Sequence, residues 1–261
     1  MAATADADAG PVALPGPGDP GGRRLGWVGL GVAAFCFLVG VLAASILGAT
    51  WAASRGFLGD DARLEADFGF FVISAVGLWV GFLGLPLLWS WTLGGPGPVL
   101  GMKARWTDLP LGLVAGLGST LVTGVISGML LSSDELGALE RKARETVDRA
   151  SGPAAVVLLV FVICIATPIA EEVFFRGLVF RSLRGVAGLV VALPVAGLVF
   201  GLVHYDREPV AALVVAVQLG LLGLFGVVLC ALAHWTGRLA ASIVAHAAFN
   251  SVTVLTLLLS R

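Results

Sequence analysis

The chain has 261 residues, of which 58% are hydrophobic and only 13% are charged, and its mean hydropathy is +0.98. A soluble domain carries roughly 25% charged residues, so this chain is too apolar to cover a surface that faces water. The net charge of −1 gives no basis for binding nucleic acid. The three cysteines lie in apolar runs without CxxC or Cys/His spacing, so the sequence predicts no disulfide framework and no cysteine-based metal site. The lipid bilayer is the expected solvent.

Residues 1–25 are rich in Ala, Asp, Pro and Gly and show no apolar periodicity, which is typical of a disordered tail. Seven apolar runs follow, each long enough to cross a hydrocarbon core, which takes about 20 helical residues. Trp27 and Trp51 bracket the first run, as amphipathic rings at the two headgroup levels would. We therefore expect an all-α fold, a polytopic transmembrane helical bundle of about seven spans. The expected spans are residues 26–53, 68–91, 109–131, 153–180, 187–204, 210–235 and 239–259.

Residues 132–151 interrupt this pattern with charges of both signs. Glu140 and Arg144, and again Glu145 and Arg149, are four residues apart, the spacing at which opposite charges meet on a helix. The segment predicts an amphipathic surface helix at the membrane edge. Its role is open between a solvated face and a gate over a site in the membrane.

Lysines and arginines in short loops predict the orientation, because cytoplasmic loops of membrane proteins are enriched in them. One side of a seven-span bundle would carry Arg23, Arg24, Lys103, Arg105, Arg181, Arg184 and Arg238. The other side would carry the surface helix with Arg55, Arg63, Arg207 and Arg261. We expect the first side, with the N-terminus, to be cytoplasmic. The bias of 14 Arg to 2 Lys is typical of a GC-rich genome, so we expect a bacterial plasma membrane.

The residues that carry chemistry lie in a C-terminal core, residues 152–261, and not in the N-terminal helices, residues 26–151. Of the 17 acidic residues, only Glu171 and Glu172 stand inside a long apolar run. A charge at the bilayer centre costs at least about 2.5–3.5 kcal/mol, so both need partners, water or a function. Glu172 shares a helix face with Arg176, whereas Glu171 points about 100° away and keeps a free carboxylate for general-base work. A purely structural role in tying helices together is the alternative for both.

The three histidines have different surroundings in the sequence. His246 and Asn250 are four residues apart, so one helix face presents an imidazole and an amide, donors suited to an oxyanion. His234 stands beside Trp235 at the end of a span, where an inter-helix hydrogen bond is the expected role. His204 ends the fifth apolar run.

The fourth and fifth runs predict a helical hairpin with its turn near residues 185–188. Glu171 precedes this turn by about as many residues as His204 follows it, so both should lie at nearly the same depth. Pro168 lacks an N–H and should kink the helix beside Glu171. A kink next to a buried acid favours a wet cavity.

Three short motifs stand in order, each deep in an apolar run: Glu-Glu-xxx-Arg, Phe-xxx-His and His-xxx-Asn. With them, residues 153–254 resemble the CPBP family of intramembrane proteases. That family includes type II CAAX prenyl endopeptidases and bacterial abortive-infection and bacteriocin-immunity proteins. In this sequence the motif positions are Glu171, Glu172 and Arg176, then Phe200 and His204, then His246 and Asn250.

The resemblance implies an endopeptidase that hydrolyses a peptide bond in or near the bilayer. It implies that Glu171 activates the attacking water and that His204 helps to hold this water. It assigns the developing oxyanion to His246 and Asn250. The supporting residues would be Glu172, Arg176 and Phe200.

Several alternatives stay open beside this prediction. No cofactor is expected, since the chain lacks HExxH, but a zinc site made of Glu171, His204 and His246 with an open position is the alternative. A non-catalytic immunity or scaffold protein of the same family is a second. A proton-coupled transporter is a third, although it predicts inverted repeats that the sequence does not show. The expected partner is a membrane-associated peptide or protein substrate, and the sequence makes no prediction of the oligomeric state.

Overall fold

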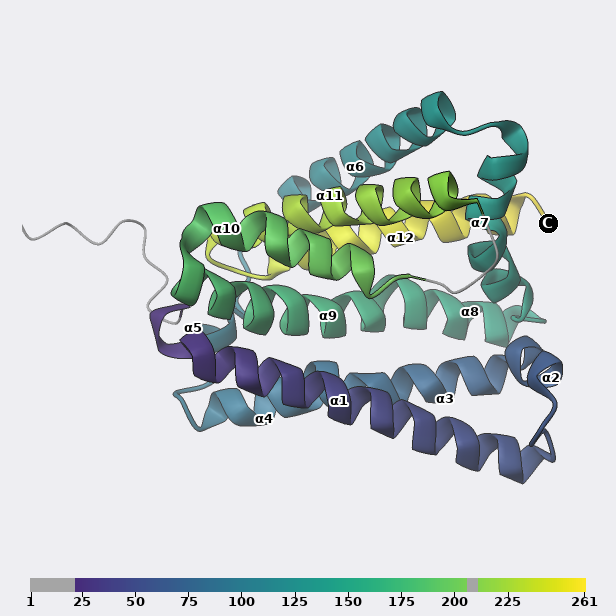
Figure 1. Cartoon of the computed structure of the whole chain (residues 1–261), viewed down its shortest axis with the longest axis horizontal. Coiled ribbons are helices and arrows are strands. Elements are labelled where there is room, and N and C mark those ends of the chain that lie inside the picture. The colour runs from purple at the N-terminus through teal and green to yellow at the C-terminus, as the bar shows by residue number, and fades with distance from the viewer. Residues whose placement is uncertain (1–21, 206–210) are drawn as a thin grey trace, which may run out of the picture.

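The computed structural model describes residues 22–205 and 211–261, and all regular structure in these ranges is helical (Figure 1). Most of the expected tail, residues 1–21, lies outside the described residues. The described elements are α1 (Gly22–Arg55), α2 (Asp61–Ala66), α3 (Phe68–Trp79), the π-helix η1 (Val80–Gly84), α4 (Leu85–Trp91), α5 (Pro96–Leu100), α6 (Asp108–Leu130), α7 (Ser133–Asp148), α8 (Pro153–Phe161), the π-helix η2 (Val162–Ala166), α9 (Thr167–Glu171), the π-helix η3 (Glu172–Phe180), α10 (Arg181–Leu202), α11 (Ala212–Thr236) and α12 (Ala240–Leu259).

Six helical segments of the described chain are long and apolar enough to cross a membrane. Five of them coincide with expected spans to within a few residues. The fourth, Pro153–Leu202, has 50 residues, which is about 75 Å of helix against a hydrocarbon core about 30 Å thick. It joins the fourth and fifth expected spans, so it has to fold back. The six segments are Leu25–Arg55, Phe68–Trp91, Asp108–Leu130, Pro153–Leu202, Ala212–Thr236 and Ala240–Leu259.

The reversal lies at Gly188, where φ is 74° and ψ is 175°, a conformation that glycine alone adopts readily. After it, the chain returns alongside α9 and ends partway along the bundle (Figure 1). The expected fifth span, residues 187–204, is therefore corrected. Its leg beyond the turn, residues 189–202, is only about 21 Å long at about 1.5 Å per residue, so it stops inside the hydrocarbon depth.

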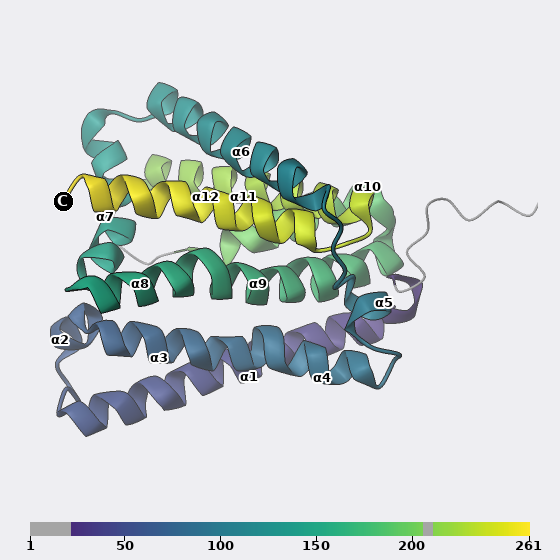
Figure 2. The same ribbon diagram turned by 180° about the vertical axis from the view of Figure 1, so that it is seen from behind.

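The long helices run lengthwise through the bundle, with α6 inclined to the others (Figure 2). Helix α1 packs against α3, α10 against α11, and α6 against α12 on the reverse face. At Gly201, a Cβ would come within 2.5 Å of the Leu219 carbonyl oxygen, so only glycine allows α10 this close to α11. The largest buried cluster joins side chains of α1 and η1 to those of η3, α10, α11 and α12. The N-terminal helices therefore pack directly against the part of the chain that holds the three motifs.

The expected surface helix is present as α7, which lies across one end of the bundle (Figure 1). A capping box starts it: Ser132 Oγ accepts from the backbone N–H of Glu135, and Glu135 Oε2 accepts from that of Ser132 at 2.9 Å. The helix buries Val147 and exposes its charged face.

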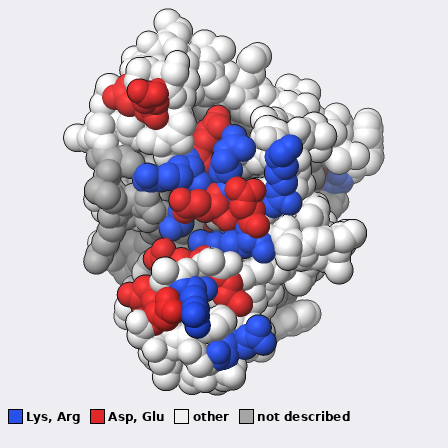
Figure 3. All heavy atoms as spheres, turned by 90° about the vertical axis from the view of Figure 1, so that its right-hand side faces the viewer, with Lys and Arg blue, Asp and Glu red and all other residues white. Residues whose placement is uncertain are grey.

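Charges of both signs gather on this end of the molecule (Figure 3). The predicted pair of Glu140 and Arg144 is present at 3.6 Å. The predicted pair of Glu145 and Arg149 is not formed, and Glu145 instead lies 4.0 Å from Arg141. Further pairs join Arg63 to Asp60 and Arg261 to Asp148.

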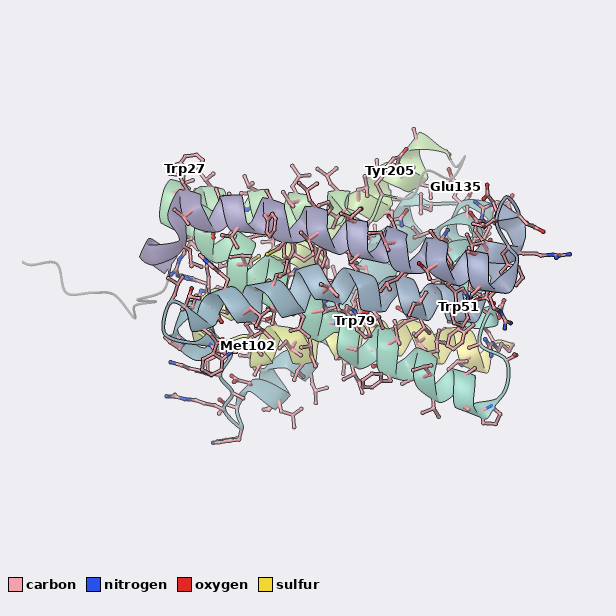
Figure 4. The ribbon with its side chains drawn as sticks, turned by 90° about the horizontal axis from the view of Figure 1, so that it is seen from below. Trp27, Trp51, Trp79, Met102, Glu135 and Tyr205 are labelled. Carbon is pink, nitrogen blue, oxygen red and sulfur yellow. The ribbon has the colours of Figure 1, made fainter. Side chains whose placement is uncertain are left out.

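Aromatic side chains mark the length of the bundle. Trp27 and Trp51 lie toward opposite ends of α1, with Trp79 between them (Figure 4). The helical rise puts the first two about 36 Å apart, close to the thickness of a hydrocarbon core with its interfaces. This placement agrees with tryptophan at the two headgroup levels.

Candidate active site

Glu171 and Glu172 are both buried, with 9% and 0% of their surfaces exposed, and they face different partners. Oε2 of Glu171 lies 3.9 Å from Nε2 of His204 and 3.8 Å from Nε2 of His246. The predicted common depth of Glu171 and His204 is therefore confirmed. The depth of His246 could not be derived from the sequence, and α12 brings it to the same oxygen.

The separations at Glu171 are longer than a direct hydrogen bond, which takes about 2.7–3.2 Å. Oε2 of Glu171 is buried and has no hydrogen-bond partner among the described residues. A buried carboxylate oxygen without a partner is costly, so this site is suited to an exogenous donor. One water molecule between the three side chains would be within reach of all of them.

Glu172 belongs to a separate, fully buried ion pair. Nη1 of Arg176 donates to its Oε1 at 2.8 Å, and neither side chain is exposed. Nδ1 of His246 lies 3.0 Å from the same oxygen. Because Arg176 also donates to the Gly226 carbonyl at 3.4 Å, its charge is both neutralised and hydrogen-bonded. The predicted pairing of Glu172 with Arg176 is confirmed.

Hydrogen bonds at the Nδ1 atoms set the orientation of the two imidazole rings. Nδ1 of His204 lies 2.7 Å from the Phe200 carbonyl, which only accepts, so this nitrogen carries a proton. Nδ1 of His246 faces the Glu172 carboxylate, which also accepts. Both rings therefore turn Nε2 toward Glu171.

Phe200 packs beneath this group, as the resemblance implied. The Arg176 guanidinium lies 4.2 Å above its ring centroid, and the His204 and His246 rings lie 4.7 and 5.7 Å from it. The Phe200 ring therefore packs against the Arg176 guanidinium and against both imidazoles.

Asn250 has a backbone partner. Its Nδ2 donates to the Ile163 carbonyl at 2.9 Å, in η2, two helical turns before Glu171. In η2 the N–H of Thr167 bonds five residues back to Val162, and the next donor in that register would be Pro168, which has no N–H. Asn250 supplies the bond that the proline cannot. The irregularity expected at Pro168 is therefore a π-helical turn held by α12.

A cavity of about 490 Å³ leads to Glu171 between α1, α3 and the helix that carries the acid. Its wall is mostly apolar, with Trp79 hydrogen-bonded to Thr167 at 3.3 Å beside Glu171. Arg149 also lines it. Sequence reasoning treated Arg149 only as a charge on the surface helix, since nothing in the spacing shows that it faces a cavity.

Two further expectations concern a possible metal site and the inter-helix hydrogen bond of His234. Within the described ranges, no cluster of three or more His, Cys, Asp or Glu side chains has the arrangement of a metal site. His234 makes the expected inter-helix bond, with its Nδ1 2.8 Å from Nη1 of Arg184.

Residues 153–252 match the family model Rce1-like, described as type II CAAX prenyl endopeptidase Rce1-like. This segment contains all three motifs, with Glu171, Glu172 and the ionisable side chains that lie within 4 Å of them. No curated protein and no solved structure matches the chain. The match agrees with the resemblance that the motifs carry. Over residues 153–252, this integral membrane protein is therefore similar to the Rce1-like family of type II CAAX prenyl endopeptidases.

Proposed function

We propose that this protein is an intramembrane endopeptidase in which Glu171 activates water to hydrolyse a peptide bond. One observation carries the proposal: an unpartnered carboxylate oxygen faces two imidazole nitrogens at 3.8 and 3.9 Å. Of these groups, Glu171 lines an apolar cavity. The family match to residues 153–252 supports protease chemistry at this place.

The reaction begins with a water molecule between Glu171 and His204. Oε2 of Glu171 takes one proton, Nε2 of His204 accepts the other water hydrogen in a hydrogen bond, and the water oxygen attacks the carbonyl carbon of the peptide. A carbon–oxygen bond forms and the carbonyl electrons move to its oxygen. Glu171 then passes its proton to the peptide nitrogen. The carbon–nitrogen bond breaks, leaving a carboxylic acid and an amine.

The oxyanion formed in this step needs a donor. His246 donates from Nε2 when both of its ring nitrogens carry protons, and the Glu172 carboxylate at 3.0 Å is then the counter-charge. A low dielectric strengthens this interaction, since His246 is only 4% exposed. The resemblance assigns Asn250 to the same oxyanion, and its amide has a second N–H for that purpose beside the bond to Ile163.

We propose no metal step, and the test includes a chelator for this reason. Wild type and Glu171→Gln are compared on candidate membrane peptides in detergent, with Glu140→Gln as a matched control on the exposed face of α7. Loss of the general base should lower the rate by about 10²–10⁴. Thermal unfolding and size-exclusion chromatography check that the variant keeps its fold.

The outcomes separate the alternatives. Cleavage that is lost in Glu171→Gln and kept with chelator supports the proposal. Loss with chelator and recovery with zinc would assign Glu171, His204 and His246 to a metal. Full activity of Glu171→Gln would overturn the mechanism. The non-catalytic alternative is an immunity protein, and a cell-protection assay tests it. If the variant that lacks both Glu171 and His204 still protects cells, that alternative is favoured.

A further inference from the structure

The cavity that reaches Glu171 holds a positive charge toward its other end. Arg149 is the C-terminal cap of α7, at the end of the bundle where α3 begins (Figure 1). The wall between Arg149 and Glu171 comes from apolar and small side chains of α1, α3 and the helix before Glu171. Two opposite charges thus mark the two ends of one apolar cavity.

Among the described residues, Arg149 has no counter-charge, unlike three other arginines at its end of the bundle. Across residues 25–205 and 211–261, its guanidinium has neither an ion pair nor a hydrogen bond. Arg63, Arg144 and Arg261 on the same end are each paired with a carboxylate. Arg149 is half-buried, and an unpaired cation next to apolar surface is costly, so an anion bound there would stabilise it.

The dimensions of the cavity fit one extended chain. It follows α3 and η1 from Phe70 to Phe82, which is about 18 Å of helical rise. Its volume is about 490 Å³. An extended peptide covers the same length with about five or six residues.

We propose that Arg149 binds a carboxylate of the peptide substrate, about five or six residues from the bond that Glu171 cleaves. This inference rests on the proposed function. A guanidinium binds a carboxylate through two parallel hydrogen bonds. Arg149 would therefore require an anionic group in the substrate and would set its distance from the cleaved bond. The carboxylate belongs either to the C-terminus of the peptide or to an acidic side chain.

Binding is tested without cleavage in a Glu171→Gln background in detergent micelles. The probe is a fluorescent ten-residue Leu/Ala/Val peptide with a free C-terminal carboxylate, beside its amide and an amide carrying one Glu in the last position. Amidation should weaken binding at least tenfold, and the added Glu should restore it if any carboxylate suffices. Arg149→Gln should bind all three peptides equally, with the affinity that wild-type Arg149 shows for the amide. Arg149→Lys should recover part of the loss, and Arg63→Gln should change nothing.

A charge-swap variant distinguishes loss of the Arg149 charge from misfolding, because it should gain affinity for a different peptide. Arg149→Glu should reject the free acid and bind a peptide that ends in a primary amine. Equal affinities of wild type and Arg149→Gln for acid and amide would overturn the inference. The inference would also be overturned if Arg149→Gln weakened binding to anionic lipid in nanodiscs but left binding of the peptide carboxylate unchanged. The ligand of Arg149 would then be a lipid headgroup.

Cleavage by the protein with Glu171 intact separates this inference from the proposed function. Mass spectrometry of the products should place the cut about five or six residues from the carboxylate and move it when the carboxylate is moved. A cut that is insensitive to the carboxylate and to Arg149→Gln contradicts the inference alone. Arg149-dependent binding without any cleavage contradicts the proposed protease.

Discussion

Two adjacent glutamates have different surroundings because a helix turns them toward different neighbours. Glu172 meets Arg176 and His246 in the core, whereas Glu171 faces two Nε2 atoms and a cavity. The i,i+4 spacing was enough to predict this division, since it depends on one helix alone. The partnership of Glu172 with His246 was not predictable, because it depends on how α12 is rotated against η3.

The buried pair leads to a prediction about stability. Arg176→Met should destabilise the protein by about 3–5 kcal/mol, because it leaves Glu172 as an unpaired charge at 0% exposure. The double variant with Glu172→Gln should be more stable than Arg176→Met alone, since an amide carries no charge and still accepts from His246. Thermal unfolding in one detergent measures both.

The exposed pair of Arg63 and Asp60 serves as the control. Arg63→Met should cost about 0–1 kcal/mol, because the two side chains are 71% and 43% exposed. The prediction is contradicted if Arg176→Met lowers stability no more than this control does, or if the double variant is the least stable. Arg176 would then not be needed to neutralise the buried charge of Glu172.

At the scale of the element, the π-helix η2 depends on a residue far away in the chain. The sequence predicted a distortion at Pro168 from its missing N–H, but not the identity of the group that replaces this donor. That group is Asn250, and its approach depends on the packing of α12 against η2.

The compensation between these residues can be tested directly. Asn250→Ala should cost about 1–3 kcal/mol, because the Ile163 carbonyl loses its partner inside the membrane. Adding Pro168→Ala should restore part of this stability, since an N–H returns at the position that the π register requires. Stability is followed by thermal unfolding, and peptide cleavage is followed in parallel.

The two readouts separate the two roles of Asn250. Recovery of stability without recovery of cleavage would mean that its amide also serves the oxyanion. Recovery of both would mean that Asn250 acts only by holding η2. No recovery of stability would contradict the exchange of donors between Asn250 and Pro168.

The hairpin within α10 is the second element that positions the site. Gly188→Ala should destabilise the protein by about 1–3 kcal/mol and lower cleavage, because φ of 74° is unfavourable for alanine and the leg that carries His204 starts there. No atom lies within 4 Å of the added Cβ, so the cost is conformational. Gly118→Ala in α6 is the matched control, since that site is equally open and has no positive φ. Equal effects of the two substitutions on unfolding and cleavage would exclude the turn as the cause.

At the scale of the whole molecule, composition and hydropathy were sufficient to predict a helical membrane bundle with a surface helix. They did not show that the fifth apolar run is a short leg, because apolar residues look alike whether they span a bilayer or stop within it. The difference comes from Gly188 and from the end of α10 at Leu202. That short leg is what places His204 beside Glu171 at depth.

The two ends of the bundle differ in charge, and this difference leads to a prediction about orientation. We propose that the end with Lys103 is cytoplasmic and the end with α7 is outside, because basic residues in short loops are retained on the cytoplasmic side. On intact cells, an impermeant maleimide should label Glu140→Cys and not Lys103→Cys, and permeabilised cells should show both. The three native cysteines are buried, at 1–4% exposure, so the background is low.

The reverse labelling pattern would contradict this orientation, and labelling of both variants in intact cells would mean mixed insertion. The result also bears on the substrate. Arg149 caps α7, so the predicted pattern means that a substrate carboxylate bound there lies on the outer side while the cleaved bond lies deeper, at Glu171. A peptide added outside intact cells should then be cut, whereas the opposite orientation restricts cleavage to peptides supplied from the cytoplasm.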